Sequence, residues 1–282
     1  MPPPLPATLL RAALQPGPDG LVCAIEPATA GWTWTTFHAY RLEPGMIVER
    51  SADGSERLVL LLEGWADVRA GDRAFENVGS RTTVFDGPPA EVVLVEPGLD
   101  LRVTARTPAL VGIGAAPAGL VRRTAHVPAS EILVEDRGEG NTSRRIHHLL
   151  GPSAEAGRLI AFEALVPGGN WCSYPPHKHD VEQPPVEAAL EEIYFFRFAR
   201  PQGFAFVRVY TADRSLDESL TPMDGDTVLV PRGYHPVGVP AGYDCWFLNV
   251  MAGPNRAWNF TIDPDHAWLM NWSPAAPRSA GQ

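Results

Sequence analysis

Short apolar segments recur along the whole chain, and most are bounded by glycine, proline or aspartate. Alternating or continuous apolar runs of this length are typical of β-strands, whereas an amphipathic helix needs a longer run with apolar positions three and four residues apart. Helical spacing predicts only short helices, at 5–14, 129–135 and 186–191. The strand pattern predicts β-strands at 35–42, 57–62, 81–86, 91–95, 100–105, 110–115, 159–165, 192–198, 203–210, 226–230 and 244–250.

The residues between these segments favour an all-β fold. Of 282 residues, 29 are proline and 26 are glycine, and both types favour turns over long helices. Many short strands at this spacing predict a β-sandwich or barrel. The polar, Gly-rich stretch 135–144 suggests two halves, residues 1–135 and 136–282. A strand with a Gly-bearing turn is expected at both 79–89 and 225–235, as a repeat in which only the second copy carries a histidine.

Charge and cysteine content exclude several classes of protein. Lys and Arg number 23 against 33 Asp and Glu, a net charge of −10 with neutral histidines. An acidic chain without a basic cluster lacks the phosphate neutralisation that sequence-independent nucleic-acid binding needs. Cys23, Cys172 and Cys245 are too sparse for a zinc pair or a disulfide framework, which favours a reducing compartment, the cytoplasm. No apolar run approaches the ~18 residues of a membrane helix, so neither nucleic acid nor membrane is an expected partner.

Three histidines and one glutamate form a candidate metal site. Two prolines precede His177, Lys178 and His179 and favour an extended backbone there. Side chains alternate along a strand, so the two imidazoles share one face and the lysine points away. On the strand at 192–198, Glu192 shares a face with aromatic side chains, where a carboxylate is costly unless it meets a cation.

The neighbouring Glu191 is expected to be a solvated charge at the start of that strand, and His235 follows a Pro-Arg-Gly turn. Three imidazoles and one carboxylate suit one divalent ion, which would be Zn, Mn, Fe, Co or Ni. The alternative is that these are ordinary surface or core histidines.

The arrangement resembles the cupin superfamily, whose first motif supplies H-x-H and a glutamate and whose second supplies a histidine after G-x5-P-x-G. A closer resemblance covers nearly the whole chain. The strings GNWCSYPPHKHD, LEEIYFFRF, QGFAFVRVYTADRSLDE, GDTVLVPRGYHPV, GYDCWFLNVMAGPNRAW and DPDHAW, with VFDGPP and RGEGN earlier, are similar to the 5-deoxyglucuronate isomerase family of myo-inositol catabolism, itself similar to the 5-keto-4-deoxyuronate isomerases.

That resemblance implies an all-β bicupin of two tandem double-stranded β-helix (jelly-roll) barrels. The first barrel would be structural and without metal ligands, and the second would hold the metal on His177, His179, Glu192 and His235. It also implies an aldose–ketose isomerase that converts 5-deoxy-D-glucuronate into 5-dehydro-2-deoxy-D-gluconate. The partner would be this small sugar acid, and a homodimer is compatible with the sequence.

The group that moves the proton stays open at this point. Tyr174, Tyr243, a metal-bound hydroxide or an unassigned carboxylate would each fit, and a hydride shift would need no base. Two other classes also remain, a metal-dependent cupin dioxygenase and a non-catalytic sugar-binding cupin.

Two groups of basic residues complete the candidates. Arg208 shares its strand parity with two phenylalanines and is expected on an interior face, where it is either paired with an acid or free to grip a substrate carboxylate. Arg144, Arg145, His147 and His148 are expected together on a solvated strand edge or turn.

Overall fold

A computed structural model describes residues 8–13, 15–117, 123–152 and 154–272, and within these residues the fold is built almost wholly from β-strands. Helical segments are short and comprise α1 (Pro27–Ala30) and the 3-10 segments η1 (Ala129–Glu131), η2 (Gly140–Thr142) and η3 (Pro264–Asn271). No helix in the described ranges is long and apolar enough to cross a membrane.

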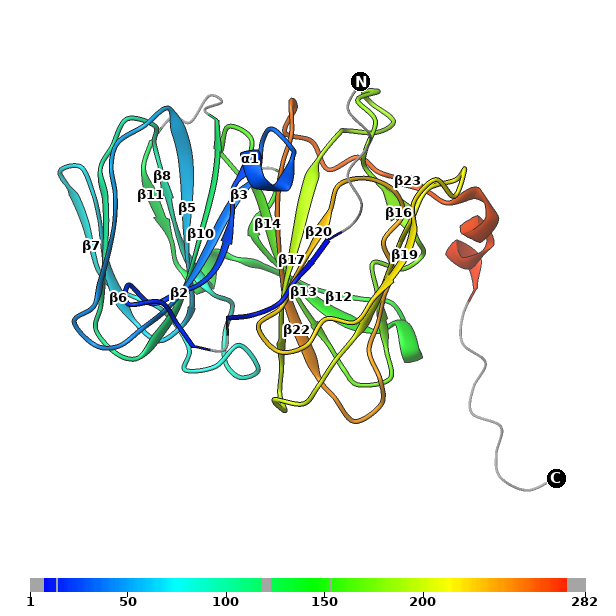
Figure 1. Ribbon diagram of the computed structural model, residues 1–282, viewed down its shortest axis with the longest axis horizontal. Helices are drawn as coiled ribbons and strands as arrows, with labels where there is room; N and C mark the ends of the chain where they lie inside the picture. The colour runs from blue at the N-terminus through cyan, green and yellow to red at the C-terminus, as the bar shows by residue number, and fades with distance from the viewer. Residues whose placement is uncertain (1–7, 14, 118–122, 153, 273–282) are drawn as a thin grey trace.

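The strands form two units of stacked sheets that lie side by side (Figure 1). In the first half, a six-stranded sheet has the order β11-β8-β5-β10-β3-β2 and a four-stranded sheet has the order β4-β9-β6-β7. Their strands are β2 (Leu21–Ile25), β3 (Thr36–Leu42), β4 (Ile47–Arg50), β5 (Ser55–Glu63), β6 (Ala66–Ala70), β7 (Arg73–Val78), β8 (Glu91–Val95), β9 (Leu101–Ala105), β10 (Ala109–Pro117) and β11 (Ala125–Val127).

In the second half, a seven-stranded sheet has the order β1-β20-β17-β22-β14-β13-β12, a four-stranded sheet the order β15-β21-β18-β19, and β16 pairs with β23. Their strands are β1 (Thr8–Leu10), β12 (Leu133–Arg137), β13 (Arg144–Leu150), β14 (Ile160–Val166), β15 (Trp171–Cys172), β16 (His177–Lys178), β17 (Glu191–Phe198), β18 (Phe206–Tyr210), β19 (Asp217–Leu220), β20 (Thr227–Val230), β21 (Val237–Gly238), β22 (Cys245–Ala252) and β23 (Thr261–Ile262).

The two large sheets also pack against each other and bury both of their faces. Along β5, Leu58, Leu60 and Leu62 join a core shared with the second half, while Val59 and Leu61 pack inside the first half. A strand that is buried on both faces needs a continuous apolar run rather than an alternating one. This explains the run at 57–62 and makes the contact between the halves part of the hydrophobic core.

Two glutamates, the buried Glu56 and the half-buried Glu191, fasten the halves together. The Glu191 carboxylate accepts backbone N–H bonds of 2.6–2.9 Å from residues 33–35 in the first half. In the opposite direction, Glu56 accepts three such bonds of 2.5–2.7 Å from residues 157–159 in the second half. Glu191 is therefore a structural acceptor, and the expectation that it is a solvated charge is wrong.

One strand of the N-terminal part of the chain joins the sheet of the second half. The first strand, β1, lies against β20 at the edge of the seven-stranded sheet. This pairing covers β20, whose free peptide groups would otherwise be open to pairing with another chain.

Most predicted strands are present, but some local predictions are wrong. Segment 81–86 forms turns and an isolated bridge, because the side chain of Arg81 is buried against Glu163. The described part of the helix predicted at 5–14 contains β1, whose peptide groups pair with β20, and residues 5–7 and 14 lie outside the described residues. Residues 186–191 are not helical, and 129–135 form η1 and then enter β12.

The expected boundary between residues 135 and 136 falls inside β12, a strand of the second half. The repeat also differs from the predicted one. In the first half, Arg57 of β5 lies opposite Val95 of β8. The equivalent pair in the second half is Glu192 of β17 opposite Val230 of β20. Each valine is followed three residues later by a glycine with positive φ, so the first copy of the repeat follows β8 and does not lie at 79–89.

Candidate metal centre

Three segments that are far apart in the sequence deliver the candidate ligands to one point. Glu192 is the second residue of β17, His179 follows β16, and His235 lies in the turn after β20. All three side chains are buried, and one possible ligand atom from each lies within 4.8 Å of the others. Glu192 Oε2 lies 3.0 Å from His179 Nε2 and 3.2 Å from His235 Nε2.

The fourth predicted ligand, His177, lies beside this cluster. Its ring centroid is 5.1 Å from that of His235 and 6.3 Å from that of His179. The structure thus brings the four predicted residues into one neighbourhood, with His177 outside the tighter group of three.

Each imidazole is oriented by a backbone carbonyl. His177 Nδ1 lies 3.2 Å from the Pro175 oxygen, His179 Nδ1 lies 3.1 Å from the Leu190 oxygen, and His235 Nδ1 lies 2.8 Å from the oxygen of residue 233. A carbonyl only accepts hydrogen bonds, so Nδ1 carries the proton in each neutral ring and Nε2 keeps its lone pair. This is the orientation that metal-binding histidines need.

The electrostatics of the cluster favour a cation. Burial opposes ionisation of Glu192, but the influence of the adjacent His179 and His235 outweighs it and holds the pKa of this carboxyl far below its ordinary value. Burial, reinforced by the two neighbouring imidazoles, lowers the pKa of His177 to about 3. His235 Nε2 is buried and has no hydrogen-bond partner in the described part of the chain. Neutral imidazole lone pairs facing a buried carboxylate fit a divalent cation.

The loop around the H-x-H segment is held by its own charges. Lys178 Nζ bonds Asp180 and Glu187 at 2.6–3.0 Å and so uses its charge outside the cluster, as strand alternation predicted. Asp180 in turn accepts the N–H of Gly233 at 2.7 Å. At Gly233 φ is +87°, and a Cβ there would lie 2.4 Å from the Tyr210 oxygen, so the turn that presents His235 needs glycine.

A small cavity of about 60 Å³ adjoins the cluster. Asn249 donates to Glu192 Oε1 at 2.5 Å and fixes the carboxylate. The Tyr194 hydroxyl shares a hydrogen bond of 2.9 Å with Ser173, and burial raises the pKa of this phenol well above its ordinary value. The remaining lining residues are mostly apolar, with two arginines: Arg137, Arg144, Ile146, Phe162, Ala164, Cys172, His177, Phe247 and Trp258.

Comparison with known proteins identifies the family. The model of the KduI/IolB family matches residues 9–269. The chain belongs to the KduI/IolB family. A relative from Geobacillus thermodenitrificans, named 5-deoxy-glucuronate isomerase, is 42% identical over 93% of this chain and 95% of its own length. A relative of the same name from Listeria monocytogenes is 39% identical over 93% of this chain and 96% of its own length.

Solved structures support the same assignment. An IolB-like protein from Salmonella typhimurium aligns with a TM-score of 0.90 at 38% identity, covering 93% of this chain and 98% of its own. An oxalate decarboxylase from Lactobacillus farciminis aligns with a TM-score of 0.61 at 12% identity, over 93% of this chain and 88% of its own, which is a likeness of fold. The predicted family resemblance and the predicted all-β bicupin architecture are confirmed.

Within this KduI/IolB chain, the three further candidates lie away from the cluster. Arg208 points outward and forms a two-point ion pair with Asp217 at 2.7–2.8 Å. The predicted interior face is wrong, because Phe206 is 54% exposed while the valines between these residues face the core. Tyr174 packs on Trp171, and its raised pKa reflects partial burial.

Tyr243 packs on Phe204 near the start of β22. Neither Tyr174 nor Tyr243 is among the residues that line the cavity beside the cluster. The cavity instead contains Tyr194, Asn249 and Arg144, which sequence reasoning did not select. Alternation from Glu192 could have indicated Tyr194, since the two residues share a face of β17.

His147 corrects another expectation. It is 3% exposed, and its Nδ1 lies 2.6 Å from Glu163 in the core rather than on a solvated edge. Its strand, β13, has neighbours on both sides and is not a sheet edge.

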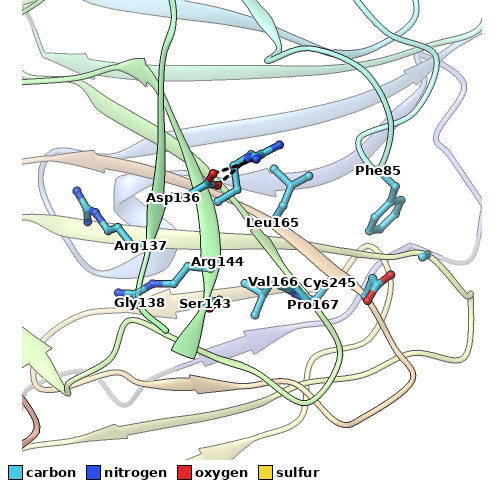
Figure 2. A pocket seen from close by; sticks show the side chains of 13 residues that line it. Phe85, Asp136, Arg137, Gly138, Ser143, Arg144, Leu165, Val166, Pro167 and Cys245 are labelled. Carbon is cyan, nitrogen blue, oxygen red and sulfur yellow. Dashed lines mark hydrogen bonds and ion pairs between the residues drawn. The ribbon is translucent and has the colours of Figure 1, made fainter. Parts of the chain in front are cut away.

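A larger cavity, of about 430 Å³, lies beside β12 and β13 (Figure 2). Its lining includes Phe85 and Leu165, and Asp136 and Arg145 form an ion pair within it. The metal candidates do not line it. The smaller cavity is therefore the one in which the cluster and polar side chains converge.

Proposed function

We propose that this chain isomerises 5-deoxy-D-glucuronate to 5-dehydro-2-deoxy-D-gluconate in the cavity beside the His–Glu–His cluster. One observation carries the proposal: the chain aligns over 93% of its length, at 42% identity, with a protein named 5-deoxy-glucuronate isomerase. The compact group of buried metal-capable residues found within the described ranges supports it, since Glu192 of that group and the neighbouring His177 line a cavity.

We further propose that His177, His179, Glu192 and His235 hold one divalent cation, which would be Zn, Mn, Fe, Co or Ni. The carbonyl-oriented imidazoles and the orphaned nitrogen of His235 support this donor set. A bound divalent cation supplies Lewis acidity, which lowers the barrier for moving hydrogen between a hydroxyl-bearing carbon and the adjacent carbonyl carbon.

The chain's own side chains prepare the cavity for that reaction. Asn249 holds the Glu192 carboxylate in one orientation. The hydroxyl of Tyr194 lines the cavity and, like any phenol whose pKa is not lowered, keeps its proton at neutral pH, so it can donate a hydrogen bond to a substrate oxygen. The aromatic rings of Phe162, Phe247 and Trp258 line the cavity and limit water around the reacting carbons.

The first half is proposed to be structural. In the sheet register, Arg57 stands where Glu192 stands in the second half. Its guanidinium donates to backbone oxygens of Leu99 and Ser51 and pairs with Asp53. A buried guanidinium at this position disfavours a second divalent cation. For the assembly and location we propose a homodimer in the cytoplasm, testable by analytical ultracentrifugation and by cell fractionation.

The test is proton NMR of purified metal-loaded protein with 5-deoxy-D-glucuronate in D2O under nitrogen. The expected result is conversion of the aldehyde acid to the ketose without oxygen. Deuterium in the product would indicate proton transfer through solvent, and its absence would indicate hydride transfer. Turnover that needs and consumes oxygen would instead indicate a dioxygenase, and binding without a product would indicate a sugar-binding protein. Either of these results would refute the isomerase proposal.

A further inference from the structure

Two arginines share the metal cavity, and the mechanism above does not use them. Arg137 is the last residue of β12 and Arg144 is the first of β13, and the two lie directly opposite each other in the antiparallel ladder. Both line the cavity that also contains His177 and Glu192. Both also line the larger cavity drawn in Figure 2, where their side chains extend to the same side of the strand pair, away from Phe85. Like charges directly opposite in a ladder are destabilising, so this arrangement calls for a compensating anion.

The two arginines differ in what neutralises them. The guanidinium of Arg137 makes a two-point contact with Glu135 at 2.7 and 2.8 Å. Hydrogen bonds from Arg137 and His148 lower the pKa of Glu135 to about 2, although partial burial opposes this. Arg137 therefore already has its counter-ion.

Arg144 has no carboxylate partner among the described residues. Its two terminal nitrogens donate to backbone oxygens of Thr142 and Tyr174 at 2.9 and 3.1 Å. Its Nε is buried and has no hydrogen-bond partner in the described part of the chain. A guanidinium cannot lose its proton in a protein, so a full positive charge, fixed in place by two carbonyls, faces the cavity with one donor unused.

We propose that Arg144, with Arg137 beside it, is the subsite that binds the carboxylate of the sugar acid. This inference rests on the proposed function and deepens it. A six-carbon aldehyde acid carries its reacting carbonyl at one end and its carboxylate at the other. With the carboxylate on Arg144, the aldehyde end lies toward the His–Glu–His cluster, so the charge that selects acids over neutral sugars also sets the direction of binding.

The next residue along the chain provides a matched control. Arg145 lies on the opposite face of β13, pairs with Asp136 at 2.8–3.0 Å, and does not line the metal cavity. Arg144→Gln and Arg145→Gln therefore remove the same charge from adjacent positions, one inside the cavity and one outside it.

The experiment measures both variants and the wild type with 5-deoxy-D-glucuronate and with 5-deoxy-D-glucose, which has the same carbon chain but an alcohol in place of the carboxylate. A hydrogen bond to a charged group is worth roughly 10- to 100-fold in binding. We expect Arg144→Gln to raise KM for the acid by about this factor while kcat changes much less. Arg145→Gln should match the wild type, and kcat/KM for the neutral sugar should be the same within about twofold in all three proteins.

A second measurement does not need turnover. Titration calorimetry of chelator-treated protein with 5-deoxy-D-glucuronate should detect binding to the wild type and to Arg145→Gln, and binding about 10-fold weaker or more to Arg144→Gln. If the wild type binds the acid in this way but never isomerises it, the proposed function fails while the subsite stands.

Equal binding and equal KM in Arg144→Gln would overturn the subsite while the isomerase proposal stands. If Arg144→Gln does not fold, the wild type alone still decides the question. A kcat/KM ratio near one between the acid and the neutral sugar would refute the inference, and a preference for the acid of tenfold or more would support it.

Discussion

The buried ion pair that joins the two halves gives a prediction whose size follows from the structure. Glu163 of β14 is fully buried and accepts two hydrogen bonds from Arg81, at 2.9 and 2.6 Å, and one from Trp246 Nε1 at 3.0 Å. His147 Nδ1 lies 2.6 Å from the same carboxylate. Glu163→Gln keeps the shape of the side chain but removes the negative charge, which leaves the guanidinium of Arg81 buried without a counter-ion.

Two independent arguments give a similar loss of stability for Glu163→Gln. Breaking a buried pair by neutralising one partner costs about 3–5 kcal/mol. Independently, although burial opposes it, the charge and hydrogen bonds of Arg81 and His147 lower the pKa of Glu163 from 4.5 to about 2. At about 1.4 kcal/mol per tenfold change in acidity, this difference corresponds to about 3 kcal/mol. Because the folded-state pKa lies below the unfolded-state value, this stability is present above about pH 4.5 and is lost as the pH falls toward 2.

The assay is urea denaturation followed by tryptophan fluorescence at pH 7 and at intervals down to pH 3. We expect Glu163→Gln to unfold about 3 kcal/mol more easily than the wild type at pH 7, with the difference shrinking below pH 4.5. The control is Asp217→Asn, which breaks the exposed ion pair with Arg208 and should leave the free energy of unfolding nearly unchanged, because water screens exposed ion pairs. An unchanged free energy of unfolding in Glu163→Gln, or a difference that grows as the pH falls, would refute the reasoning.

Four further predictions concern the metal site and its surroundings. His235→Ala should lose bound metal and activity while its circular dichroism stays that of the wild type, and a metal-replete His235→Ala would count against the donor set. Exhaustive EDTA treatment should abolish isomerisation and a divalent ion should restore it, whereas activity that survives full metal removal would argue against the metal's role. Glu191→Ala should lower the free energy of unfolding by about 2–4 kcal/mol, because three backbone donors lose a charged acceptor, and the metal content should not change. An unchanged free energy of unfolding would contradict the role of Glu191 in holding the halves together. Arg208→Ala should leave KM and kcat within about twofold, since its partner is Asp217 on the outer face, and a large rise in KM would place it back in the site.

Periodicity predicted the central strands well because burial leaves a direct mark on sequence. The run at 91–95 is β8 in full, and 57–62 lies within β5, where both faces are buried. Prediction failed where tertiary contacts decide the backbone. Thr8–Leu10 has the composition of a short helix, yet becomes a strand because the edge of β20 offers it partners. Segment 81–86 alternates like a strand, yet is held as a loop by Arg81.

The candidate ligands were predictable because each carries a local signal. Two imidazoles two residues apart, a carboxylate among aromatic side chains and a histidine after a Gly-bearing turn are visible in the sequence alone. The role of Glu191 was not visible, since the backbone N–H groups that donate to its carboxylate lie more than 150 positions away in the sequence. Arg208 misled the prediction because parity along β18 separates two faces but does not say which one is buried.

The pairing of β1 with β20 has a practical meaning for dissecting this protein. Severing the linker between β11 and β12 would leave β1 on the N-terminal piece without its partner strand, and would leave β20 uncovered at the edge of the sheet in the C-terminal piece. Alone, the C-terminal piece would present this open sheet edge and tend to self-associate. When the two pieces are co-expressed in one cell, they should instead associate and reconstitute the complete fold.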